Sequence, residues 1–129
     1  MGRNKQVKVH TIAPIFLHKD DLKLLDETMP YLWARTRNDV FVQALRIAVE
    51  MLEGGRSRHF NQFVYPTENL LEGHAQTFRL TKDEVEYLDW LAERLRIGSR
   101  AETARMLIRF GRWYFEHAKA SFDALKKLS

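Results

Sequence analysis

Positive charges that could contact a polyanion gather in two short segments of this chain. Arg3, Lys5 and Lys8 lie in the first ten residues without an acidic neighbour, and Arg56 and Arg58 follow a pair of glycines. Such segments can follow a phosphate backbone, although a solvated tail and a solvated loop have the same composition. The net charge of the whole chain is only +4, so any anion binding would depend on where these charges lie.

Residues that commonly catalyse reactions or bind metals form no recognisable arrangement. The histidines lack the helical or strand spacing that two ligands of one metal need: His10, His18, His59, His74 and His117. The absence of cysteine from the sequence excludes disulfides, thiolate nucleophiles and cysteine zinc sites. Neighbouring acids such as Asp20 and Asp21 fit the first turn of a helix, where carboxylates favour the dipole. We therefore expect neither an enzyme nor a cofactor.

Composition indicates one small folded domain or two interlocked units. The chain has 129 residues, of which 45% are hydrophobic. The basic N-terminus lacks the apolar stretch of a signal peptide, and no apolar run is long enough to cross a bilayer. We predict a soluble, cytoplasmic protein without a membrane partner.

An internal repeat with an offset of 63 residues organises the chain. Residues 15–53 align without a gap on residues 78–116, and matched positions include Leu17 and Leu80, Leu25 and Leu88, and Arg46 and Arg109. A repeat of this length marks a unit that cannot bury its apolar face alone. We therefore predict that the two units bury their apolar faces against each other.

The second unit has the pattern of a strand followed by two helices. Residues 76–80 alternate, which directs Phe78 and Leu80 inward and leaves Ala75, Thr77 and Arg79 outward. A helix then begins near residue 81 and stops at a glycine, residue 98, which accepts a left-handed conformation. A capping box over residues 99–102 starts the last helix, whose final turns either pack on the connecting segment or offer Trp113, Phe122 and Leu125 to another chain.

The first unit repeats this pattern with differences. Its strand, around residues 7–17, places Ile12, Pro14 and Phe16 on the outer face, and residues 12–17 are expected to pair with residues 76–80. Pro30 is expected to kink or end the first helix, because proline removes a backbone hydrogen bond. Arg35 replaces the stop glycine of the second unit, so we expect the two copies to differ at this turn.

These patterns divide the chain into four parts. They are a basic arm (1–10), the first unit (11–54), a packed crossover with a helical turn near residues 67–72 (55–74), and the second unit with its long helix (75–129). The expected fold is mainly α with a two-stranded antiparallel ribbon.

The order of strand, helix, capped turn and helix, with a serine-arginine-x-glutamate start to the last helix, resembles the ribbon-helix-helix family of MetJ/Arc-type DNA-binding proteins. The resemblance covers residues 76–115 well and residues 13–52 more weakly. It implies a tandem ribbon-helix-helix pseudo-dimer, with a layout similar to the TraY-like relaxosome accessory proteins of conjugative plasmids.

The resemblance implies a partner, double-stranded DNA, and a site. A two-stranded ribbon fits the major groove, and the outward residues would contact bases: Thr77, Arg79, Ile12 and Phe16. The starts of the second helices and the basic segments would contact phosphates: Thr36, Arg37, Asn38, Ser99, Arg100, Arg3, Lys5, Arg56 and Arg58. Capping alone would also explain the hydroxyl residues, and a salt bridge would also explain Arg37 and Arg100.

The expected function is sequence-specific DNA binding by a transcriptional repressor or an accessory factor at a plasmid or phage site. The protein would then be nucleoid-associated when bound to DNA, and self-association could occur through the C-terminal helix. The alternative is a protein-interaction module that uses the same fold without base readout, because Ile12 and Phe16 read no hydrogen-bond pattern and exposed apolar residues mark interaction sites.

Overall fold

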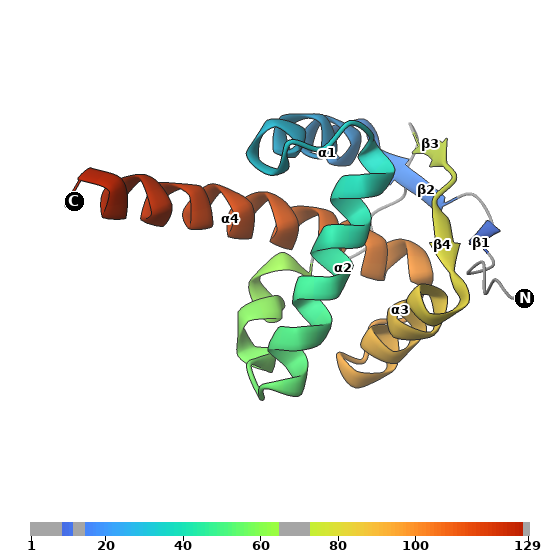
Figure 1. Ribbon diagram of the computed structural model, residues 1–129. Coiled ribbons are helices and arrows are strands. Elements are labelled where there is room, and N and C mark those ends of the chain that lie inside the picture. Colours follow the sequence, from blue (N-terminus) through green and yellow to red (C-terminus); the bar gives the residue numbers. More distant parts are fainter. Residues whose placement is uncertain (1–8, 12–14, 65–72, 128–129) are drawn as a thin grey trace, which may run out of the picture.

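The computed structural model describes residues 9–11, 15–64 and 73–127, which form a mainly helical fold with a small two-stranded antiparallel ribbon (Figure 1). The elements follow in the order β1 (Val9–Thr11), β2 (Ile15–His18), α1 (Lys19–Leu32), α2 (Arg37–Glu53), the 3-10 helix η1 (Ser57–Phe63), β3 (Gly73–Gln76), β4 (Arg79–Thr81), α3 (Lys82–Arg94) and α4 (Arg100–Lys127). The expected mainly α fold with a ribbon is confirmed. The basic arm, Ile12, Pro14 and the turn expected near residues 67–72 lie outside the described residues.

The helices keep the 63-residue spacing of the sequence repeat. α1 begins at Lys19 and α3 at Lys82, while α2 begins at Arg37 and α4 at Arg100. Each of the first helices is capped by the residue before it, His18 or Thr81, whose side chain accepts a hydrogen bond from the first turn. The spacing therefore extends from the residue pattern to the local structure.

The turn between α3 and α4 differs from its prediction. Gly98 is not the left-handed residue; Arg96 is, with a φ of 56°. The N–H groups of Arg96 and Ile97 donate to carbonyl groups of the last turn of α3, at 3.2 and 2.8 Å, and this closes the helix two residues before the glycine. The first unit has Trp33 at the equivalent position, with a φ of 55°. The expected difference between the copies at Arg35 is therefore wrong.

Pro30 does not end the first helix. It lies inside α1, which continues to Leu32. Because the proline is in the last turn, the helix loses only the one hydrogen bond that its missing N–H would make. The N–H of Ala34 reaches back to the carbonyl of Met29 at 3.1 Å and closes the turn.

The ribbon joins the two units by antiparallel pairing. β2 pairs with β3, with Ile15 opposite Gln76, and β1 pairs with β4, with Thr11 opposite Arg79. The numbers of paired residues sum to 91 in the first ladder and to 90 in the second, so the register changes by one residue between them. The pairing extends further along both strands than the sequence predicted. A one-residue change of this kind is the signature of a β-bulge.

Side chains alternate along the ribbon as predicted. Ile15, Leu17, Phe78 and Leu80 are buried, at 5%, 0%, 0% and 0% exposure. Phe16, between two of them, is 59% exposed. One face of the ribbon therefore closes the core, and the other face is open to solvent.

Apolar contacts in the core join the two units. The ring of Phe41, on α2, stacks on the ring of Phe78, which precedes β4, with centroids 4.1 Å apart. α2 also crosses α4 closely at Ala44 and Gly111, where a Cβ built on the glycine would lie 3.0 Å from the alanine Cβ. A larger side chain at Gly111 would push the two helices apart.

The segment after α2 is packed on α4. Phe60 and Phe63 of η1 are buried, and Phe60 lies against Phe110 with centroids 4.9 Å apart. Trp113 packs on Phe63 at 5.6 Å, so this residue contacts the connecting segment, the first of the two alternatives. The side chains of Phe122 and Leu125 lie outside the described part. α4 itself projects well beyond the body of the protein (Figure 1).

Ion pairs also cross between the units. Buried Asp21 accepts a hydrogen bond from Arg105 at 2.8 Å and lies 3.6 Å from Arg109. Buried Glu84 lies 3.4 Å from Arg46. The last pair is related to the pair of Asp21 and Arg109 by the same 63-residue offset, with the roles of the two units exchanged.

We predict that Phe41→Ala destabilises the protein by about 3–5 kcal/mol, because it removes a fully buried ring that joins the units. The free energy of unfolding in urea measures this loss. Phe16→Ala is the matched control, since this exposed ring should cost about 0.5 kcal/mol or less. Equal losses in the two variants would contradict the arrangement of the ribbon faces.

Candidate nucleic-acid interface

The outer face of the ribbon carries the residues predicted to contact bases. Phe16, Thr77 and Arg79 are all exposed, and Ala75 lies opposite Phe16 on the neighbouring strand. Ile12, the fourth predicted base contact, lies outside the described residues. The exposed face thus presents one arginine, one hydroxyl and one aromatic ring from three adjoining parts of the ribbon.

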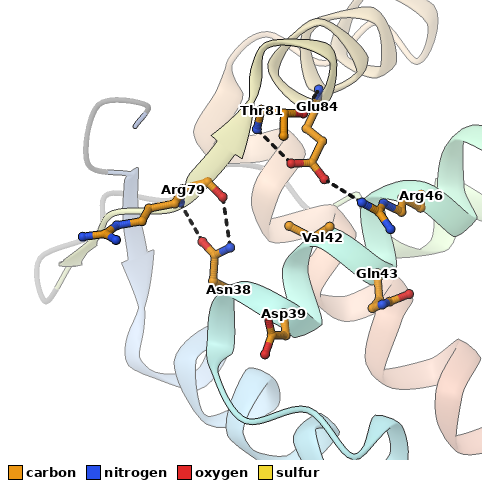
Figure 2. Close-up of a pocket in the computed structure, with 8 residues that line it drawn as sticks. All are labelled: Asn38, Asp39, Val42, Gln43, Arg46, Arg79, Thr81 and Glu84. Atoms are coloured by element: carbon orange, nitrogen blue, oxygen red, sulfur yellow. Dashed lines mark hydrogen bonds and ion pairs between the residues drawn. The ribbon is translucent and has the colours of Figure 1, made fainter. Parts of the chain in front are cut away.

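The backbone of Arg79 is held by the first turn of α2. The side-chain amide of Asn38 accepts a hydrogen bond from the Arg79 N–H at 2.6 Å and donates one to the Arg79 carbonyl at 3.0 Å. Figure 2 shows that the guanidinium of Arg79 points away from α2 and from the pocket of about 320 Å³ beside it. Strand and helix are therefore fixed to each other while the charged group is left in solvent.

The N-terminus of α2 lies next to this strand. The Thr36 hydroxyl accepts a hydrogen bond from the N–H of Asp39 at 3.1 Å, which confirms its role as a cap. The N–H groups of Arg37 and Asn38 have no acceptor within the helix, since the first turn of a helix lacks them. Arg37 also donates to the side chain of Gln76 at 3.4 Å, so this helix end touches both β3 and β4.

The N-terminus of α4 has a similar cap. The Ser99 hydroxyl accepts a hydrogen bond from the N–H of Glu102 at 3.1 Å, and the Ser99 carbonyl accepts one from Thr103 at 3.0 Å. α4 contacts β2, so this end lies by the ribbon as the end of α2 does. The position after Arg100 is an alanine, residue 101, where α2 has Asn38.

Both arginines at these helix starts form bidentate salt bridges. Arg37 binds Asp26 at 2.8 and 2.9 Å, and Arg100 binds Asp89 at 2.7 and 2.8 Å. These hydrogen bonds hold the pKa of Asp26 and of Asp89 below the usual range of aspartate. The salt-bridge alternative is thus observed for both arginines, and their charges are partly neutralised. Each pair joins a first helix to the second helix of its own unit.

The predicted phosphate contacts do not all lie together. Arg56 and Arg58 are exposed beside η1, beyond the C-terminal end of α2, whereas Thr36 and Asn38 lie at its start (Figure 1). A helix of the length of α2 spans about 25 Å. The two loop arginines are therefore separated from the ribbon. Arg3 and Lys5 lie outside the described residues.

Sequence reasoning missed the contact between Asn38 and Arg79. No local signal could have found it, because the two residues are far apart in the chain and one contributes only its backbone. The pairs of Arg37 with Asp26 and Arg100 with Asp89 do carry a signal. Both have a separation of 11 residues and both are related by the 63-residue offset, so the repeat alone relates them.

Comparisons with protein-family models, with curated proteins and with solved structures gave no match. In the part of the chain that the structure describes, no group of three or more histidine, aspartate or glutamate side chains could hold a metal ion. Across the same residues, no helix combines the length and the apolar character that spanning a bilayer requires.

The two salt bridges predict a dependence of stability on pH. A carboxyl whose pKa is lower in the folded state stabilises the fold above its unfolded pKa of about 3.9, and this contribution is lost as the pH falls through the folded pKa. The groups are about half exposed, so each pair is worth about 0.2–1 kcal/mol. We expect Asp26→Asn with Asp89→Asn to lower the urea midpoint near neutral pH.

The difference between this double variant and the parent should shrink once the pH is well below about 3.9, where the parent carboxyls become protonated. Asp20→Asn with Asp83→Asn is the control, because it removes two exposed acids from first helical turns. A difference that persists undiminished in acid would show that lost packing, and not the charge, is responsible.

Proposed function

We propose that the chain is a tandem ribbon-helix-helix pseudo-dimer that binds double-stranded DNA by inserting its ribbon into the major groove. The observation that carries this proposal is the contact between Asn38 and the backbone of Arg79. It makes the exposed face of the ribbon and the N-terminus of α2 one continuous surface. A ribbon reads base edges while flanking helix ends hold phosphates, so the two parts must be fixed to each other.

Each part of this surface has a role in the proposed complex. The exposed guanidinium of Arg79 would donate two hydrogen bonds to a guanine, and the Thr77 hydroxyl would contact a neighbouring base. Phe16 would contact thymine methyl groups. The free N–H groups at the starts of α2 and α4 would each hold a phosphate on one side of the groove.

The two halves of the proposed interface differ, and so should the two halves of the target. Arg79 and Phe16 occupy equivalent positions, 63 residues apart, with different chemistry. Operator symmetry mirrors protein symmetry, so the preferred site would not be a palindrome. Such a protein would act in the cytoplasm, at the nucleoid, as a repressor or as an accessory factor at a plasmid or phage site.

Two observations favour a second candidate, a protein-interaction module of the same fold. Phe16 is 59% exposed and Trp33 is 93% exposed, and large exposed apolar side chains mark interaction sites. Retention on double-stranded DNA and on heparin separates the candidates. Retention on both that is lost with rising salt supports DNA binding, whereas no retention favours a protein partner.

Self-association through α4 remains a prediction. Equivalence with α2, which ends at Glu53, would end α4 at Glu116, but α4 continues to Lys127. Solution mass without DNA tests this idea. A monomeric mass at every concentration would exclude it, and a dimer that reverts to a monomer when the chain is cut after Glu116 would support it.

We expect Arg79→Ala to reduce the preference for the selected site by about 1–3 kcal/mol, that is, about 5- to 150-fold in affinity. The measurement is a fluorescence anisotropy titration of a duplex chosen by wild-type protein from a randomised pool, and of a scrambled duplex. Arg79→Lys should keep part of the affinity and little of the preference, because lysine cannot form the bidentate contact.

Arg96→Ala is the matched control. It removes the same charge from an exposed arginine at the far end of α3, away from the ribbon. It should lower binding to both duplexes slightly and leave their ratio unchanged. An unchanged ratio in Arg79→Ala as well would remove Arg79 from base readout.

A further inference from the structure

We propose that Asn38 is a positioning residue that fixes the backbone of Arg79, so that the guanidinium enters the groove in one orientation. This inference rests on the proposed DNA binding. Its starting point is the pair of hydrogen bonds at 2.6 and 3.0 Å between the Asn38 amide and the Arg79 N–H and carbonyl. Both partner groups belong to the backbone, so the contact leaves the arginine side chain free.

The strand needs this support at Arg79. Arg79 is the first residue of β4, and Thr77 and Phe78, just before it, belong to neither ladder. The register also changes by one residue at this point. Opposite residues in an antiparallel pair alternate between those that bond across the pair and those whose N–H and carbonyl point outward. Arg79 is of the second kind, because its N–H and carbonyl face Asn38.

The side chain of Asn38 takes the place of a third strand. An amide offers one acceptor and one pair of donors, which matches the N–H and carbonyl of a single backbone residue. Alanine offers neither group, and an ionised aspartate would place a charge against the Arg79 carbonyl. Asparagine is therefore well suited to hold an outward-facing strand residue from a neighbouring helix.

Asn38 is itself held in place. It lies between Arg37, whose guanidinium is bound to Asp26, and Asp39, whose N–H is bound to the Thr36 cap. The start of α2 is therefore fixed to α1 and to its own cap before it reaches the strand. Rigid support of this kind is what a base-reading side chain requires, because hydrogen bonds to a base edge tolerate little displacement.

Only one half of the protein has the residues for this contact. The position equivalent to Asn38 is Ala101, and the position equivalent to Arg79 is Phe16. The amide accompanies the arginine and is absent where an aromatic ring replaces it. An apolar contact with thymine methyl groups is less directional than a bidentate hydrogen bond, so the Phe16 half has less need of a fixed backbone.

The test is Asn38→Ala, alone and combined with Arg79→Ala. We expect the single variant to lose about tenfold of the affinity ratio between the wild-type-selected duplex and the scrambled duplex, as expected when two hydrogen bonds are removed. In the Arg79→Ala background the same change should leave the ratio unaltered, since Asn38 acts through Arg79. The slope of affinity against salt should not change, because the side chain contacts no phosphate.

A measurement without DNA tests the contact itself. Amide hydrogen exchange at Arg79 should become at least about tenfold faster in Asn38→Ala, because the N–H loses its acceptor. Gln43→Ala is the matched control. It removes an amide that lines the same pocket on α2, and Figure 2 draws no bond from it to Arg79. Exchange at Arg79 should be unchanged in that variant.

The outcomes separate this inference from the proposed function. If wild-type protein binds no duplex, the proposed function fails, and the DNA role of Asn38 fails with it. If wild-type protein discriminates and Asn38→Ala does so equally well, only the inference is overturned. A weaker binding that lowers the salt slope by about one and spares the ratio would make the Asn38 side chain a phosphate contact instead.

Discussion

Antiparallel pairing between strands that lie more than 50 residues apart is the interaction on which the rest of the fold depends. In the described ribbon, each strand has a partner only from the other unit, so neither unit can satisfy its strand backbone alone. The same pairing places Leu17 and Leu80 in one core. The buried carboxylate of Asp21 likewise finds Arg105 in the other unit. Backbone, apolar and ionic requirements all make each half dependent on the other.

This dependence also fixes the candidate interface. Once the inward residues of the ribbon are committed to the core, the period of two leaves Phe16 and Arg79 outward, and nothing local could reverse them without exposing Phe78 or Leu80. The second helices must then cross over the ribbon to cover the core, which brings their N-termini to its edges. The proposed site is thus a consequence of how the core is closed.

The sequence predicted the parts of this arrangement that are set locally. The alternation at residues 76–80 and the caps at Thr36 and Thr81 depend on near neighbours, and they were correct. The turn after α3 was wrong because a glycine was taken as the stop, whereas a hydrogen bond from Ile97 back to the helix closes it earlier and leaves Arg96 left-handed. Asn38 was assigned to a phosphate from its place in a helix start. Its tertiary partner, a backbone group on another unit, leaves no trace in composition or period.

A covalent link between the two units removes a constraint that identical subunits face. In a symmetric dimer every substitution occurs twice, so a change that suits one half-site must also suit the other. In this chain Arg79 with Asn38 and Phe16 with Ala101 occupy equivalent places and could diverge as separate pairs. The inward positions could not, because both sets of side chains share one core, and they have stayed apolar in both units. Divergence on the outer face with restraint on the inner face is what separate contacts to an asymmetric partner would produce.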